Sequence, residues 1–86
     1  MDKTVIEEKV VSVIGSLFAI NDDVIVREAK LSKDLDLDEM CMLDLVLELE
    51  NEFSVQISDD EEAKWKTVGD IVDFIDGLLN PQHTPT

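Results

Sequence analysis

The sequence is short of several residue types, and each shortage excludes a class of protein. A single cysteine, Cys41, cannot form an internal disulfide. The only histidine, His83, has no Cys and no second His beside it, so neither a metal site nor a catalytic role is expected there. Seven Lys and Arg against 21 Asp and Glu give a net charge of -14, which argues against nucleic acid as a partner because phosphate binding needs clustered basic side chains. No apolar run approaches the roughly 18 residues that span a bilayer.

The residues that are present indicate one small domain that folds. The 86 residues allow a single domain, and 44% apolar residues supply enough surface for a core although 33% are charged. The lone cysteine and the absence of a secretion-signal pattern favour the cytoplasm. Residues 80–86, which include Pro81 and Pro85, are expected to form a disordered tail, so the domain is expected to span residues 1–79.

Apolar residues recur at spacings of three and four in the first half of the chain, which predicts two long helices. The first runs from about Thr4 to Phe18. A long connection follows, in which residues 21–23 are expected to cap a short turn, and a loop of this length should pack on the core or carry function. Asp38 is the predicted N-cap of the second helix. The expected core-facing residues of that helix are Leu45, Val46, Leu49 and Phe53, and a second row, only partly buried, comprises Met40, Leu43 and Leu47.

Two capping patterns predict a short third helix and a longer fourth helix. Ser58 and Glu61 have the spacing of a capping box. Thr67 is expected to cap the last helix, with Asp70 in its first turn, where the helix dipole favours an acid. The expected apolar face comprises Val68, Ile71, Val72, Ile75 and Leu78, and the expected end is at Gly77 and Pro81. No segment alternates polar and apolar residues, so the predicted fold class is all-α, with a core of Val, Ile, Leu and Phe. Trp65 is expected to plug the edge of that core rather than bind a ligand.

The central part of the chain resembles a known family. The pattern Leu31-x-x-Asp34-Leu35-x-x-Asp38-x-Met40, continued by Leu43-x-Leu45-Val46-x-x-Leu49-Glu50-x-Glu52-Phe53, is similar to the heart of acyl carrier proteins. Weaker similarities extend the resemblance from about Ile6 to Leu79. The resemblance implies a four-helix bundle of acyl-carrier type, with three longer helices and a short third one, and a carrier that is not an enzyme.

Two residues depart from the family's pattern. Members carry a serine after the aspartate that corresponds to Asp38, and its hydroxyl holds a phosphopantetheine arm; this chain has Glu39 there, followed by Met40. The loading reaction needs an oxygen nucleophile that gives a stable phosphodiester, and a carboxylate would give a labile acyl phosphate. Glu39 is therefore expected to stay unmodified, and no cofactor is expected. Asp36 replaces a glycine, so the loop is expected to have a different backbone conformation, since glycine reaches positive φ without strain.

Other nucleophiles do not restore the attachment site. Ser32 precedes the helix, Ser54 and Ser58 follow it, and none comes directly after an aspartate at a helix start. Cys41 lies two residues beyond Glu39, which rotates it by about 200° around a helix. Its acidic neighbours should also raise the pKa of the thiol and weaken the thiolate as a nucleophile.

A run of acids before the second helix has some features of a calcium-binding loop. Asp34, Asp36 and Asp38 match its first, third and fifth positions. The sixth position should be Gly but is Glu39, and the twelfth should be Glu but is Leu45. No dedicated metal site is therefore expected, while weak divalent-cation binding that relieves charge repulsion stays open.

The distribution of charge predicts a docking surface. Between Asp34 and Glu62 there are 12 acidic residues and no Lys or Arg. Acids that flank a partly exposed apolar row are typical of a surface where charge steers the encounter and apolar side chains supply the contact energy. In the family that the chain resembles, this helix docks on basic patches of partner enzymes. The corresponding residues here are Glu39, Met40, Leu43, Asp44, Leu47 and Glu48.

These observations lead to one main interpretation and two alternatives. The chain is interpreted as a monomeric, non-enzymatic acyl-carrier-like module of fatty-acid or polyketide-type metabolism. It would dock on basic patches of acyl-chain-processing or modifying enzymes without a covalent arm. The first alternative is a working carrier with phosphopantetheine at a variant site. The second is an acidic regulatory protein that responds to cations.

Overall fold

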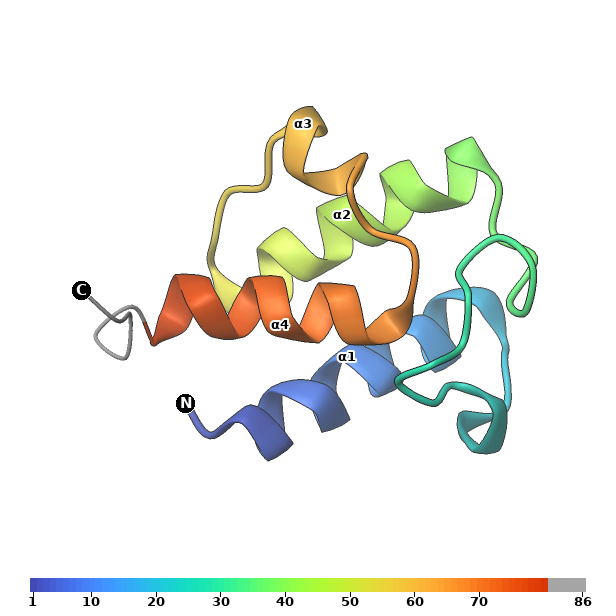
Figure 1. The fold of residues 1–86 in the computed structure, drawn as a ribbon, viewed down its shortest axis with the longest axis horizontal. Helices are drawn as coiled ribbons and strands as arrows, with labels where there is room; N and C mark the ends of the chain where they lie inside the picture. The colour runs from blue at the N-terminus through green and yellow to red at the C-terminus, as the bar shows by residue number, and fades with distance from the viewer. Residues whose placement is uncertain (81–86) are drawn as a thin grey trace.

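The computed structural model describes residues 1–80 and has four α-helices in that range (Figure 1). They are α1 (Lys3–Phe18), α2 (Glu39–Phe53), α3 (Asp59–Glu62) and α4 (Val68–Leu79), and a short 3-10 turn, η1 (Asp22–Val24), follows α1. No β-strand occurs among these residues; the single β-bridge joins Lys30 to Thr67. The all-α prediction is thus confirmed, and none of the helices in residues 1–80 has both the length and the apolar character to cross a membrane.

Short polar side chains fix where the helices begin. The Asp38 carboxylate accepts a hydrogen bond from the Cys41 backbone N–H at 2.9 Å, as the sequence predicts. Thr67 and Asp70 form a complete capping box at the start of α4. Ser58 makes only half of the expected box: its hydroxyl accepts a hydrogen bond from Glu61 N–H, whereas the Glu61 carboxylate lies 3.9 Å from Lys64 Nζ. The η1 turn follows Asn21, but the Asn21 side chain makes no capping bond.

The end of α4 differs from the sequence expectation. The helix continues through Gly77 to Leu79, because one glycine costs too little to end a helix whose apolar face is buried. Leu78 is exposed rather than buried. Asn80, which the sequence assigns to the tail, donates to Asp76 Oδ1 and to the Met1 carbonyl, both at 2.8 Å. Pro81, His83 and Pro85 lie outside the described residues.

The core is a layer of aliphatic side chains between α1, α2 and α4. Helix α1 packs against both α4 and α2, and α3 lies across the far side of α2 and α4 (Figure 1). The largest fully buried side chains come from all three long helices: Ile6, Val10, Ile14, Leu45, Leu49, Val68, Ile71, Val72 and Ile75. Trp65 is also buried, with its ring centroid 5.6 Å from that of Phe74, so its expected place at the core edge is confirmed.

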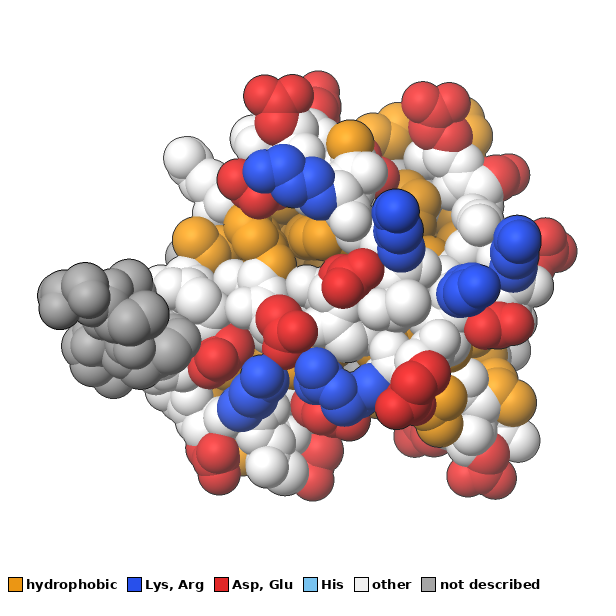
Figure 2. Space-filling view, viewed as in Figure 1, with side chains coloured by type: hydrophobic (Ala, Val, Ile, Leu, Met, Phe, Trp, Pro, Cys, Tyr) orange, Lys and Arg blue, Asp and Glu red, His pale blue; other side chains and the backbone are white. Residues whose placement is uncertain are grey.

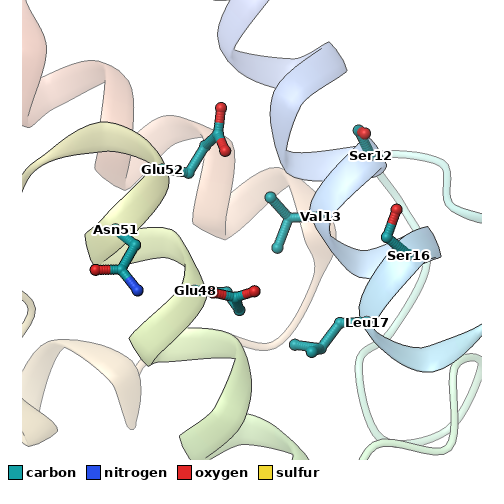
Figure 3. A pocket seen from close by; sticks show the side chains of 7 residues that line it. All are labelled: Ser12, Val13, Ser16, Leu17, Glu48, Asn51 and Glu52. Atoms are coloured by element: carbon teal, nitrogen blue, oxygen red, sulfur yellow. The ribbon is translucent and has the colours of Figure 1, made fainter.

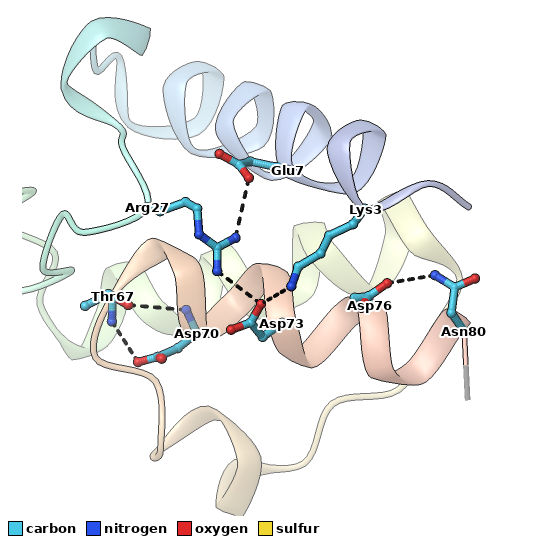
Figure 4. Close-up of polar contacts among 8 residues, drawn as sticks. All are labelled: Lys3, Glu7, Arg27, Thr67, Asp70, Asp73, Asp76 and Asn80. Carbon is cyan, nitrogen blue, oxygen red and sulfur yellow. Dashed lines mark hydrogen bonds and ion pairs between the residues drawn. The ribbon is translucent and has the colours of Figure 1, made fainter. Parts of the chain in front are cut away.

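The long connection between α1 and α2 is part of the core, as its length suggests. Its apolar residues Ile25, Ala29, Leu31, Leu35 and Leu37 are all buried. Three backbone hydrogen bonds join it to the start of α4: Leu31 N–H to Lys66 O, Val68 N–H to Ala29 O, and Gly69 N–H to Arg27 O. The Arg27 guanidinium also pairs with Glu7 of α1 and Asp73 of α4 (Figure 4). The connection is therefore held to both helices along much of its length.

Candidate functional site

The start of α2 carries the residues that the sequence assigns to the attachment site. Glu39 is the first residue of the helix, directly after the Asp38 cap, and Met40 is the second; all three side chains are exposed. The hydrogen bond from Cys41 N–H to the carboxylate holds the pKa of Asp38 below its usual value. A carboxylate, a thioether and a capping aspartate thus reach solvent side by side.

The loop before α2 corrects one expectation. Asp36 has φ of 58°, in the left-handed region that glycine occupies without strain. The backbone has therefore adopted the positive φ that a glycine would allow, rather than the different conformation expected for an aspartate. Aspartate is one of the few residues whose short polar side chain tolerates this region.

Cys41 is a poor nucleophile in this setting. It is half-buried and lies in the first turn of α2. The backbone hydrogen bond between Cys41 and Asp38 by itself lowers the pKa of the thiol. It is outweighed by a side-chain hydrogen bond to Asp38, by desolvation and by the charges of Asp38 and Asp44, so the pKa is raised overall, as predicted.

The acids before α2 do not converge on a common point. The Asp34 carboxylate accepts a hydrogen bond from Lys30 N–H at 2.7 Å, while that of Asp38 faces Cys41 N–H. In the part of the chain that the structure describes, no group of three His, Cys, Asp or Glu side chains could hold a metal ion. The carboxylates of this cluster therefore point to separate partners and do not form a metal site.

Helix α2 has two distinct apolar rows. Met42, Leu45, Leu49 and Phe53 face the core, so Met42 takes the place that the sequence gives to Val46, which is half-buried at the edge. The other row points outward: Met40 is 73% exposed, Leu43 51% and Leu47 60%. This second row is more exposed than the partial burial expected from the sequence. Glu39, Asp44 and Glu48 are also exposed, and none forms an ion pair with a residue in 1–80.

A cavity of about 390 Å³ lies next to this row, between α1 and α2 (Figure 3). Its walls combine hydroxyls, apolar side chains, an amide and two carboxylates: Ser12, Val13, Ser16, Leu17, Glu48, Asn51 and Glu52. Glu52 is paired with Lys9 at 3.2 Å. Sequence reasoning did not find this cavity, because it joins helices that are far apart in the chain and contains no motif. It extends the acidic surface of α2 toward α1.

Comparisons with known proteins agree with this architecture. A family described as phosphopantetheine attachment site matches residues 8–75. Among curated proteins, the acyl carrier protein of Chlorobium phaeobacteroides is 43% identical over 75 residues, covering 87% of this chain and 96% of the relative. That of Thermosynechococcus vestitus is 37% identical over 79 residues, covering 92% and 98%. The solved structure of the acyl carrier protein from Enterococcus faecalis superposes with a TM-score of 0.72 at 36% identity, covering 87% of this chain and 95% of that one.

The fold and the family match thus define a small helical module of the phosphopantetheine-attachment family. The chain belongs to the acyl carrier protein family. Proteins of this family are carriers rather than enzymes, they have phosphopantetheine as their prosthetic group, and they interact with acyl-processing enzymes. The family predicted from the sequence is confirmed.

Proposed function

We propose that this chain is a member of the acyl carrier family without the covalent arm, which docks on basic patches of acyl-chain-processing or modifying enzymes through α2. The observation that carries the proposal is the outward row of Met40, Leu43 and Leu47 beside the carboxylates of α2. The apolar row and the flanking carboxylates of a docking surface are both present, whereas Glu39 at the attachment position offers no hydroxyl. The protein acts as a monomer in the cytoplasm.

The docking surface is formed by Glu39, Met40, Leu43, Asp44, Leu47 and Glu48. Burying large apolar side chains releases about 25 cal/mol for each Å² removed from water. Because Met40, Leu43 and Leu47 are exposed in the free protein, their burial against a partner would release this energy. The unpaired carboxylates accelerate the encounter with a positively charged partner and fix its orientation. An acidic surface on a chain of net charge -14 selects basic partners and repels acidic ones.

The residues at the attachment position do not fit phosphopantetheine. Glu39 supplies a carboxylate where a hydroxyl is needed, and a phosphoryl ester of a carboxylate is an anhydride that water hydrolyses. Cys41 carries a thiol of raised pKa, and the nearest serine in the chain, Ser32, lies in the preceding loop on the rim of a different cavity. No step of the function therefore passes through the arm.

Intact mass tests the absence of the arm. The protein purified from its native host, and the same protein incubated with coenzyme A and a promiscuous phosphopantetheinyl transferase, should both keep the unmodified mass. Glu39→Ser should gain one arm under the same conditions, because the helix start and the loop keep their geometry. An adduct on the natural protein would overturn the proposal in favour of a working carrier with a variant site.

Transferase kinetics in the Glu39→Ser background test the docking surface separately. Alanine at Met40, Leu43 and Leu47 together should raise KM for the carrier by about a hundredfold or more, because central apolar contacts are worth about 1–2 kcal/mol each and each 1.4 kcal/mol is about tenfold. Alanine at Val24 and Val26 is the matched control, since these residues are also exposed (52% and 48%) but lie in the connection rather than on α2. Equal KM values for the two variants, with both folded by circular dichroism, would refute docking through α2.

A further inference from the structure

The two helix faces that meet at the cavity between α1 and α2 carry complementary polar groups (Figure 3). Helix α1 contributes the hydroxyls of Ser12 and Ser16, and α2 contributes the carboxylates of Glu48 and Glu52. The members of each pair are four residues apart, so they lie on one face of their helix, about 6 Å apart along its axis. In Figure 3, Glu52 and Ser12 lie toward one end of the cavity, and Glu48 and Ser16 toward the other. The cavity therefore has a carboxylate and a hydroxyl near each end.

Apolar side chains form the rest of the α1 wall of this cavity. Val13 and Leu17 line it, are half-buried, and pack against the hydrophobic core. The volume of about 390 Å³ is within the range of about 300–1,000 Å³ that is usual for small-molecule sites. Figure 2 shows the opposite side of the molecule, where most of the basic side chains in that view lie near acidic ones. An occupant of the cavity therefore needs a polar group at each end and an apolar middle.

The charges at the cavity select a cation. Within residues 1–80, Glu52 is the only one of its polar side chains that has a partner, Lys9 Nζ at 3.2 Å. Among the described residues, no Lys or Arg lines the cavity. Two carboxylates on a chain of net charge -14 repel anions and attract cations. A metal ion fits poorly, because no three potential ligand side chains converge in residues 1–80, so the expected cation is an organic one.

We propose that this cavity binds a linear aliphatic diamine with four methylene groups, without any covalent bond. One ammonium group donates hydrogen bonds to Glu48 and Ser16. The other donates to Glu52 and Ser12, and the methylenes lie on the apolar part of the α1 wall. An extended chain of four methylenes holds its two nitrogens about 6 Å apart, which is close to the axial rise of four helical residues. Lys9 competes with the second ammonium for Glu52, so the contact at Glu48 is the stronger one.

Isothermal titration with 1,4-diaminobutane, butylamine and 1,4-butanediol tests both ends of the ligand. In about 0.15 M sodium chloride, which screens the more distant charges, 1,4-diaminobutane should bind at one saturable site. Butylamine should bind at least about fivefold more weakly, because it loses one of the two charge-assisted contacts. 1,4-Butanediol should show no measurable binding. Equal affinity for 1,4-diaminobutane and butylamine would overturn the two-ended contact, and the absence of saturable diamine binding would refute the site.

Charge-matched variants locate the site. Glu48→Gln should weaken diamine binding by at least about threefold. Glu28→Gln removes the same charge from an exposed residue outside the cavity, and should change the affinity little. Lys9→Gln releases Glu52 and should tighten binding more than Lys64→Gln, which changes the net charge equally at α3. Equal losses in the two glutamate variants would show a general charge effect and refute the site, and equal gains in the two lysine variants would refute the contact with Glu52.

Amide chemical shifts place the diamine by a second, independent measurement. 1,4-Diaminobutane should move the amide signals of Ser12, Ser16 and Asn51 more than those of the acidic helix α3 (Asp59–Glu62). Equal shifts in both regions would show a diffuse layer of counterions and overturn the proposal. Glu48 also belongs to the proposed docking surface, but these titrations contain no partner enzyme. Failure of docking through α2 would therefore leave their results unchanged.

Discussion

At the scale of single residues, the left-handed backbone of Asp36 makes a stability prediction. The conformation with φ of 58° is one that an L side chain adopts at a cost of about 1–2 kcal/mol, less for aspartate. Asp36→Gly should therefore raise the free energy of unfolding by up to about 1 kcal/mol, measured by urea denaturation.

Two further substitutions at this position separate backbone strain from charge. Asp36→Asn removes the charge but keeps a side chain that tolerates positive φ, so it should leave the stability nearly unchanged. Asp36→Val should lower it by about 1–2 kcal/mol, because a β-branched residue fits the left-handed region worst. If the valine and asparagine variants were equally stable, strain at Asp36 would not be the cause.

At the scale of helices, α4 contains one glycine that is free to be replaced. A Cβ built on Gly77 meets no atom within 4 Å, and the residue is exposed inside the helix. Gly77→Ala should raise the free energy of unfolding by about 0.5–1 kcal/mol, because alanine loses less backbone entropy. Thermal melting followed by circular dichroism measures the change.

Gly69, near the start of the same helix, is the matched control. There a Cβ would lie 3.2 Å from the Arg27 carbonyl oxygen, which is itself bonded to Gly69 N–H. Gly69→Ala should gain less than Gly77→Ala or lose stability, since the connection must shift to make room. A larger gain at Gly69 than at Gly77 would contradict the close approach of the two segments.

The ion pairs that join α1, the connection and α4 make a pH prediction. Lys3 and Arg27 both contact the Asp73 carboxylate and hold its pKa below 3.8, its usual value (Figure 4). Because the pKa of Asp73 is lower in the folded protein than in the unfolded chain, its charged carboxylate stabilises the fold at pH values above the unfolded pKa. This stabilisation is lost as the pH falls through the folded pKa. Between pH 5 and pH 2, Asp73→Asn should therefore lose less stability than the natural protein.

The size of this effect is limited by solvent. The Asp73 side chain is 54% exposed, so the difference should be under about 1 kcal/mol. Asp60→Asn, which removes an exposed carboxylate of α3 that makes no ion pair within residues 1–80, is the control and should follow the natural protein. Identical acid titration of Asp73→Asn and Asp60→Asn would show that the contacts of Asp73 do not stabilise the fold.

The helices illustrate which features sequence can and cannot predict. Asp38 and Thr67 were predicted correctly as caps because a cap involves only residues three positions apart. Val46 and Leu78 were misplaced because the width of a buried stripe depends on what packs against it. The cavity between α1 and α2 joins two helices that meet only in the folded chain, so no local pattern contains it.

At the scale of the whole molecule, the net charge of -14 predicts a response to salt. Repulsion between like charges destabilises the compact state, and salt screens it. Raising sodium chloride from 0.05 to 0.5 M at neutral pH should increase Tm, by about 4–8 °C for each kcal/mol of repulsion removed. An unchanged melting curve would contradict the prediction.

Magnesium at matched ionic strength tests the alternative of a cation-responsive protein. Since no group of three potential ligands converges in residues 1–80, magnesium should stabilise the protein only slightly more than sodium does. Divalent ions screen better, but they have no built site among these residues. A concentration-dependent rise in Tm that saturates with magnesium would favour the regulatory alternative.

The hydrogen bonds between the connection and the start of α4 also have a consequence for folding during synthesis. Leu31 pairs with Lys66, and Val68 and Gly69 pair with residues of the same connection. A ribosome delivers the connection long before it delivers these partners. The first two helices can form on the growing chain, but the connection cannot make these hydrogen bonds until the start of the last helix has emerged. A nascent chain that ends before Lys66 therefore lacks all three of these hydrogen bonds.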